Sequence, residues 1–330
     1  MKSVTRKASE ISLSSHLERE TYWDKIGKNL TWMRPYSRIE NVSYNLEDFR
    51  IRWYEDGTLN ASVNCIDRHL PHYKDRLAFI WEPNEPHDFP RHITYGQLSE
   101  EVDRFSNVLK GLGIRKGDCV TIYMPMVPEA VYAMLACARI GAIHCVVFAG
   151  FSAQALAERI DDCGGKIVIT ADYGRRGAKK IPLKEEVDKA LQKAEGKTVS
   201  QVIVVRHTGD PVSMAPGRDH WYHELGAKVS STCSPVEMGA EDPLFILYTS
   251  GSTGKPKGVL HTTGGYLAYA AHTHALIFNY QPQDIYWCTA DIGWITGHTY
   301  IVYGPLANAA TSVIYEGIPT YPTASRCWRL

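Results

Sequence analysis

The chain has 330 residues, of which 44% are hydrophobic, so it can bury a sizeable core and form two or three domains or subdomains. Lysine plus arginine total 36, and so do aspartate plus glutamate, which gives a formal net charge of zero. This balance argues against a protein that binds nucleic acid or a membrane surface by general electrostatic attraction. No apolar run in the sequence reaches the length of a membrane span.

The eight cysteines are scattered without a CxxC pair, which predicts reduced thiols, a reducing compartment and no structural metal. The first ten residues are basic but lack an apolar core, so they do not form a secretory signal. Glu10, Glu18 and Glu20 disfavour the alternative of an organelle transit peptide. We therefore expect a cytoplasmic protein with a polar N-terminal arm.

Residues 1–90 are rich in aromatic side chains and have no clear periodicity. They are predicted to form an extension wrapped over the core. The aromatic residues are Tyr22, Trp23, Trp32, Tyr36, Trp53, Tyr54, Tyr73 and Trp81.

From Ile93 onward the pattern alternates between strand and helix. Thr94 and Gln97 fit a capping box at the start of a helix that ends at Gly113. The same alternation continues through strands at 119–124, 143–148, 166–170 and 201–205 and through helices at 128–139, 153–162 and 184–194. Alternation at this pace predicts parallel βαβ units whose helices cover the sheet.

Residues 207–242 are polar and rich in Pro, Gly and Ser, which predicts a surface excursion. The alternation then resumes, with strands at 243–248, 285–288 and 311–315, helices near 264–278 and 298–309, and a helix starting near 325. The predicted fold class is therefore α/β, with a parallel sheet flanked by helices. We expect a first α/β subdomain over 91–240 and the start of a second over 241–330.

The stretch from Tyr248 to Gly258 contains four serine or threonine hydroxyls, three glycines and two lysines. Glycine permits close backbone approach, while hydroxyls, amides and lysine attract phosphate oxygens, so this loop is suited to hold phosphates. A flexible surface loop is the alternative, but apolar runs flank the stretch closely on both sides. The spacing excludes a Walker A loop, because Thr249 stands where that loop needs glycine and Pro256 follows Lys255.

The run from Tyr248 to Val259 resembles the signature loop of the adenylate-forming superfamily, which includes acyl-CoA synthetases, luciferases and peptide-synthetase adenylation domains. The continuation 260–266, the run 291–298 and the stretch 59–69 narrow the resemblance to AMP-forming acetyl-CoA synthetases and their short-chain relatives. The resemblance extends from about Trp23 to the last residue. It implies the N-terminal domain of such an enzyme, with stacked, mostly parallel sheets that are flanked by helices and incomplete at the C-terminal side.

The resemblance implies an acetate–CoA ligase that converts ATP, acetate and CoA to acetyl-CoA, AMP and pyrophosphate through an acetyl-adenylate. Lys257 and Thr249 are the implied catalytic residues. The implied ATP phosphate site consists of Thr249, Ser250, Gly251, Ser252, Thr253, Gly254, Lys255 and Lys257. Mg²⁺ would bridge the phosphates, and its main carboxylate ligand is expected beyond residue 330, so no metal ligand is assigned within this chain.

Trp294, Ile295 and Thr296 form a small carboxylate pocket by the same resemblance. Without it, the favoured interpretation is a core turn between strand and helix, with Thr296 as the helix cap. Both can hold, since a helix N-terminus attracts an anion. We assign His298 no acid–base role.

Four basic residues between Tyr173 and Pro182 form a glycine-containing loop, which on charge alone is a solvated basic loop. By resemblance, Arg176 and Lys179 contact the 3′-phosphate of CoA, and Phe148 and Gly150 flank its adenine and pantetheine. Lys179 stands where the family pattern more often has arginine, so it keeps the charge but loses bidentate geometry.

The later motifs of the superfamily are absent, so we expect the chain to be the first part of a longer enzyme and to be inactive alone. The expected partners are small molecules, with no nucleic acid and no membrane. The alternatives are a propionyl-CoA or other short-chain acyl-CoA synthetase and, in another class, a non-catalytic fragment that binds nucleotide or CoA.

Overall fold

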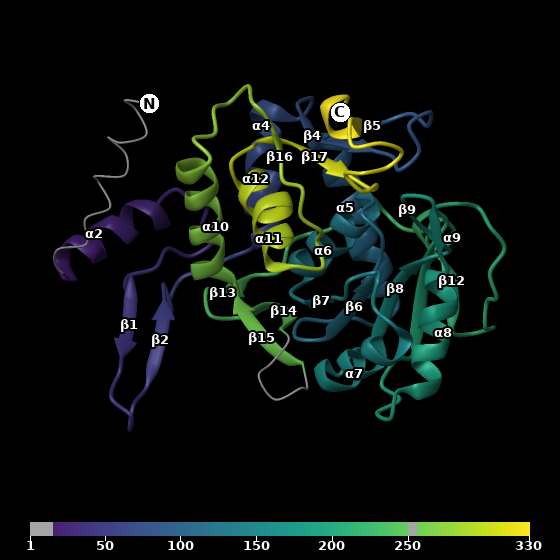
Figure 1. Cartoon of the computed structure of the whole chain (residues 1–330). Coiled ribbons are helices and arrows are strands. Elements are labelled where there is room, and N and C mark those ends of the chain that lie inside the picture. Colours follow the sequence, from purple (N-terminus) through teal and green to yellow (C-terminus); the bar gives the residue numbers. More distant parts are fainter. Residues whose placement is uncertain (1–15, 250–255) are drawn as a thin grey trace.

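A computed structural model describes residues 16–249 and 256–330 (Figure 1). The N-terminal part begins with helix α2 (His16–Gly27), which packs on α10 (Thr263–Ile277), where the Tyr22 hydroxyl lies 2.6 Å from His272 Nε2. The hairpin of β1 (Glu40–Ser43) and β2 (Arg50–Trp53) extends to one side of the molecule (Figure 1). It is followed by β3 (Thr58–Leu59), α3 (Ala61–Cys65), the 3₁₀ turn η2 (Asp67–His69) and α4 (Leu70–Tyr73).

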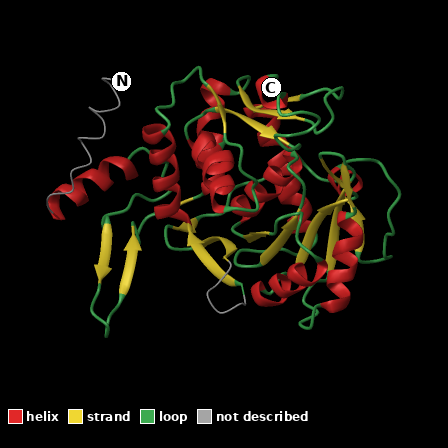
Figure 2. Ribbon diagram, viewed as in Figure 1, coloured by secondary structure: helices red, strands yellow, loops and turns green. Residues whose placement is uncertain are grey.

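In this described part of the chain, the largest sheet has seven strands in the order β12-β11-β8-β6-β7-β14-β15. The strands are parallel except β15, which lies antiparallel to β14 at the edge. Helices flank the sheet, as Figure 2 shows, and confirm the predicted α/β class. The strands are β6 (Cys119–Tyr123), β7 (Ile143–Val146), β8 (Ile167–Ala171), β11 (Gln201–Val205), β12 (Asp219–Trp221), β14 (Pro243–Thr249) and β15 (Lys257–Thr262).

The predicted helices that join these strands agree with the observed ones to within one or two residues, whereas α9 was not predicted. Thr94 and Gln97 form the capping box of α5, and Gly141, with φ of 74°, ends α6 in the left-handed conformation. β6 and β8 are buried throughout, as expected for parallel strands covered on both faces. These helices are α5 (Tyr95–Gly111), α6 (Pro128–Ile140), α7 (Ala153–Cys163), α8 (Leu183–Lys193) and α9 (Tyr222–Gly226).

A second sheet has four strands among the described residues, in the order β16-β17-β4-β5. It joins β4 (Leu77–Glu82) and β5 (Arg91–Thr94) to β16 (Ile285–Trp287) and β17 (Thr311–Tyr315). The boundaries predicted at residues 90 and 240 thus fall between strands that share a sheet, and the division into domains stays a prediction. The remaining elements are β9 (Gly174–Arg176), β10 (Lys179–Ile181), β13 (Met238–Gly239), α11 (Ile295–Gly297), the π-helical turn η3 (His298–Tyr303), α12 (Gly304–Ala307) and the 3₁₀ turn η4 (Arg326–Trp328).

Residues 207–242 hold more structure than their composition predicts. They contain β12, which forms an edge of the large sheet, as well as α9 and β13. β12 has three residues, so any alternation of apolar and polar side chains is too short to be recognised. An ion pair with a residue far away in the sequence holds the strand in place. The pair joins Lys184 Nζ to Asp219 Oδ2 at 2.8 Å, and both side chains are buried.

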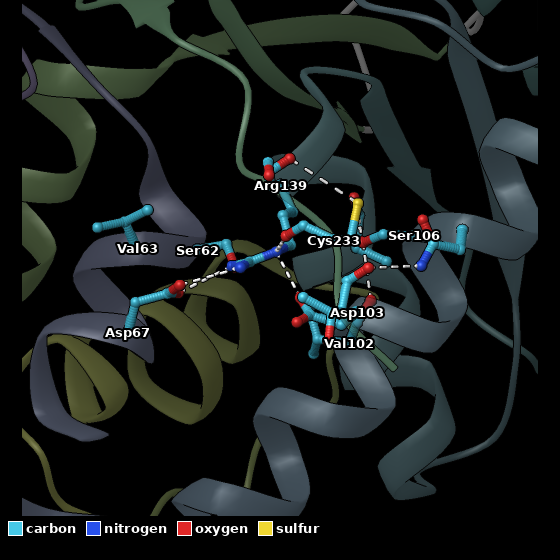
Figure 3. A network of polar contacts seen from close by, with 12 residues as sticks. Ser62, Val63, Asp67, Val102, Asp103, Ser106, Arg139 and Cys233 are labelled. Carbon is cyan, nitrogen blue, oxygen red and sulfur yellow. Dashed lines mark hydrogen bonds and ion pairs between the residues drawn. The ribbon is translucent and has the colours of Figure 1, made fainter. Parts of the chain in front are cut away.

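Arg139 ties together four segments of the core (Figure 3). Its guanidinium lies at the end of α6 and makes a bidentate pair with Asp67 of η2, at 2.8 and 2.9 Å. Its Nε lies 2.5 Å from Asp103 Oδ1 of α5 and donates to the Cys233 carbonyl at 2.7 Å. The side chains of Arg139 and Asp103 are 5% and 9% exposed, so the pair is desolvated.

Arg139→Met should destabilise the fold by about 3–5 kcal/mol, because it leaves the carboxylate of Asp103 buried without its partner. Urea unfolding followed by circular dichroism measures this change. Lys166→Met is the matched control, since Lys166 pairs with Asp118 but its side chain is 54% exposed, and it should cost less than about 1 kcal/mol. Equal losses in the two variants would contradict a structural role for the buried pair.

Candidate active site

The carboxyl ends of β6 and β8 open into a cavity. The chain passes from β6 to β7 on one side and returns to β8 on the other, so the strand order reverses between β6 and β8. Ligands of open α/β sheets bind at such a reversal, beyond the carboxyl ends of the strands. A cavity of about 120 Å³ lies here, lined by Pro125 and Met126 after β6 and by Gly174, Arg175 and Arg176 after β8.

The turn before α11 closes one side of this cavity. Asp291 lines the cavity, and its Oδ1 accepts the Gly293 amide at 2.7 Å. Burial raises the pKa of Asp291, and the Gly293 amide and the Arg176 charge offset part of that rise. Gly293 is required for close packing, because a Cβ there would lie 2.9 Å from Phe148 Cα. The turn is therefore fixed against the segment that follows β7.

The predicted carboxylate residues lie at the outer surface of this turn. Trp294 and Ile295 are 47% and 44% exposed, and Thr296 is also exposed. Trp294 is the N-cap of α11 without a side-chain cap bond, so the interpretation of Thr296 as the cap is wrong. The Trp294 ring lies 5.8 Å from the ring of Phe148 and 6.1 Å from that of Phe151. The turn thus presents its side chains to open space beside the β7 segment.

The predicted CoA residues fall in two segments that touch. Arg176 ends β9, and its guanidinium lies over the Phe148 ring at 4.9 Å. Lys179 is exposed and stands directly opposite Arg176 in the β9–β10 hairpin. A Cβ on Gly150 would lie 2.4 Å from the Phe148 ring, so glycine here permits the ring's position. The structure therefore brings these four residues to one edge of the cavity region.

The predicted phosphate loop joins β14 to β15. Thr249 and Lys257 are register partners in this pair, and both are exposed. The other predicted phosphate-binding residues, Ser250, Gly251, Ser252, Thr253, Gly254 and Lys255, lie outside the described residues. Because β14 runs parallel to β7, Thr249 leaves the sheet at the same edge as Phe148 and Gly150.

Two groups to which the sequence analysis gave no supporting role lie beside these segments. Arg159 of α7 lies over the rings of Phe151 and Tyr248, at 4.8 and 5.3 Å. A buried stack beneath the site contains His144, Phe245, His298 and Tyr303. A charged residue among the apolar positions of α7 was the available signal for Arg159, whereas the stack depends on contacts between distant segments.

His298 connects the turn before α11 to the buried stack described above. Its Nδ1 lies 3.3 Å from the Trp294 carbonyl, and its ring centroid lies 5.2 Å from that of His144. Burial lowers the pKa of His298 to about 3, so the ring is neutral at physiological pH. A neutral, fully buried ring is poorly placed for proton exchange with a substrate, in keeping with the absence of an assigned acid–base role.

The described residues offer no ready metal site. In residues 16–249 and 256–330, no three His, Cys, Asp or Glu side chains come together in a way that could hold a metal ion. Asp291, a carboxylate that lines the cavity, accepts a hydrogen bond from the Gly293 amide. No residue of this part of the chain is therefore assigned to Mg²⁺. Within the same residues, no helix is both long and apolar enough to cross a membrane.

A buried ion pair between Glu316 and His207 lies at the cavity wall. Glu316, which lines the cavity, lies 2.5 Å from His207 Nε2 through its Oε1. The same carboxylate accepts the amides of Arg175 and Asn84, both at 3.3 Å. Burial lowers the pKa of His207, but the hydrogen bond and attraction of Glu316 outweigh burial, so the pKa is raised. The protonated ring is thus the form that the fold favours.

Comparisons with known proteins place the chain in a family. The model of a family described as AMP-binding enzyme matches residues 66–330, and a model described as the acetyl-coenzyme A synthetase N-terminus matches residues 10–65. The chain is 62% identical to the acetyl-coenzyme A synthetase of Parvibaculum lavamentivorans over 94% of its length and 48% of the relative. It is 60% identical to that of Rhizobium rhizogenes, over 94% of the chain and 47% of the relative.

A third relative, the acetyl-coenzyme A synthetase of Xylella fastidiosa, is 58% identical over 94% of the chain and 48% of the relative. The chain therefore spans about half the length of the curated relatives that it matches.

The His207–Glu316 pair should make stability depend on pH. Because the folded pKa of His207 is raised, its contribution is complete below the unfolded value near 6.5 and is lost as pH rises through the folded value. The free energy of unfolding should thus fall as pH rises above the unfolded value near 6.5 and through the raised folded pKa, and His207→Gln should flatten this part of the profile. His87→Gln, at an exposed position, is the control and should leave the slope unchanged.

Proposed function

Since the chain belongs to the AMP-binding enzyme family, we propose that it acts as part of an AMP-forming acetate–CoA ligase. The enzyme would convert ATP, acetate and CoA to acetyl-CoA, AMP and pyrophosphate. The observation that carries the proposal is the convergence of three segments at one edge of the sheet. These are the β14–β15 junction, the turn at Trp294 and the contact of Phe148 with Arg176.

In the first half-reaction, an acetate oxygen attacks the α-phosphorus of ATP, and the bond from that phosphorus to pyrophosphate breaks. Two anions must approach each other, so positioning and charge neutralisation supply most of the catalysis. The Thr249 hydroxyl would donate a hydrogen bond to the phosphates. Lys257, its register partner, would offset part of their negative charge. Ser250, Ser252, Thr253 and Lys255 complete this proposed site together with the amides of Gly251 and Gly254.

Acetate would lie beside the turn formed by Trp294, Ile295 and Thr296, whose side chains are exposed. This turn is followed by the start of the short helical segment α11, and free amides at a helix start attract a carboxylate.

In the second half-reaction, the sulfur of CoA attacks the acetyl carbon, and AMP leaves. Arg176 and Lys179 would bind the 3′-phosphate, while Phe148 and Gly150 would border the rest of CoA. Mg²⁺ would accompany ATP and supply positive charge to its phosphates, with ligands outside the residues described here. A cytoplasmic location belongs to the same proposal.

Lys257→Ala should lower acetate-dependent exchange between ATP and pyrophosphate about 100-fold or more, because it removes a charge that acts on the phosphates during attack. The measurement uses the protein expressed from its complete gene. Lys189→Ala, on the exposed face of α8, is the control and should leave exchange unchanged. Unchanged exchange in Lys257→Ala would remove this residue from the mechanism, and wild-type protein without exchange would favour a non-catalytic role.

Ile295→Ala should raise kcat/KM for propionate relative to acetate by about tenfold or more, since removing its methyl groups leaves room for an additional methylene. Thioester formation with acetate, propionate and butyrate measures the change. A wild-type protein that already prefers propionate would indicate the related short-chain synthetase. An unchanged ratio in Ile295→Ala would place the acyl chain away from this residue.

A further inference from the structure

Arg159 is a buried cation in a place where a carboxylate partner would be expected. Arg159 is 8% exposed, and its Nη1 donates a hydrogen bond to the Ala155 carbonyl at 2.6 Å within α7. Within residues 16–249 and 256–330, no aspartate or glutamate forms an ion pair with it. Burying a guanidinium without an ion pair costs free energy, so its retention calls for another favourable contact.

Two aromatic rings provide that contact. The Phe151 ring centroid lies 4.8 Å from the guanidinium carbon of Arg159, and the Tyr248 ring centroid lies 5.3 Å from it. A planar cation over an aromatic ring is attracted by the ring's quadrupole, whose negative part lies on the ring face. The attraction is stronger where water is excluded. Arg159 therefore links the segment after β7 to Tyr248, the next-to-last residue of β14.

The two rings belong to the segments that form the proposed active site. Tyr248 directly precedes Thr249, the first residue of the proposed phosphate site. Phe151 lies 6.1 Å from Trp294 and 5.5 Å from Phe148, ring to ring. The relative position of these two rings thus sets the relative position of the phosphate and carboxylate segments.

Helix α7 holds Tyr248 at a second point. The Tyr248 hydroxyl donates to Asp162 Oδ2 at 2.6 Å, and Asp162 lies three residues after Arg159 on the same helix. Ser152 caps the start of this helix by accepting the Ala155 amide. The helix is thus anchored beside Phe151 at one end and against Tyr248 at the other.

We propose that Arg159 is a positioning residue for the ATP phosphate-binding segment, holding Tyr248 and Phe151 at a fixed spacing through its planar guanidinium. This inference rests on the proposed function of the site. It predicts that the plane of the side chain matters in addition to its charge. Lysine at this position would keep the charge but lose the flat surface that stacks on both rings.

Arg159→Lys and Arg159→Met should each lower the rate of acetate-dependent ATP–pyrophosphate exchange about tenfold, because misplacement of the reacting groups slows attack. Both should raise the Kd for ATP, measured by equilibrium titration in the protein expressed from its complete gene. The KM for CoA in thioester formation should change much less. Tyr248→Phe keeps the ring and should retain more activity than Tyr248→Leu.

Arg206→Lys is the matched control. Arg206 lies over the Trp221 ring at 4.8 Å, a similar contact between a cation and a ring. It lies at the β12 end of the strand order, away from β14. It should change neither exchange nor ATP affinity. Thermal melting of all variants separates positioning from folding.

Three results would overturn the proposal. Wild-type rates and ATP affinity in both Arg159 variants would show that the residue does not position the segment. Normal function in Arg159→Lys with loss in Arg159→Met would assign the effect to charge alone. Losses that follow the melting temperature, and that Arg206→Lys reproduces, would indicate a structural role. Absence of exchange in the wild type would refute the proposed function, while ATP affinity would still test Arg159.

Discussion

The constraint on which the site depends is the parallel alignment of β6, β7, β8 and β14. These strands carry buried apolar residues on both faces, so they must be covered by helices and joined by crossover connections. Parallel strands end at the same edge, and each one releases its following segment there. The segments after β6, β7, β8 and β14 therefore meet, although more than 120 residues separate the first from the last.

Buried polar groups hold this edge in place. Asp172, at the end of β8, is fully buried and accepts the amides of Tyr173, His207 and Gly209 at 2.7 to 2.9 Å. It thereby satisfies backbone donors that would otherwise be lost where β8 and β11 end. Glu316 acts similarly for Arg175 and Asn84. The edge that receives the proposed ligands is thus stabilised by carboxylates directed at the protein's own backbone.

The sequence predicted what local chemistry determines. The capping box at Thr94, the start of α6 at Pro128 and the apolar strands are encoded within a few residues, and the α/β class follows from their alternation. β12 was missed because three residues carry too little periodicity and its ion pair with Lys184 is distant in sequence. The motifs located the site segments, but the contacts of Phe148 with Arg176 and Trp294 required the fold.

Phe148 is the point at which the proposed carboxylate and CoA segments touch. Its ring contacts Arg176 on one side and Trp294 and Phe151 on the other, and glycines at positions 150 and 293 make room for it. Such close packing leaves little freedom for one segment to shift without its neighbours, because packed side chains have few alternative arrangements. The positions of the carboxylate and thiol substrates would thus depend on one another through this ring. Placing these two segments far apart in the sequence therefore does not make them independent.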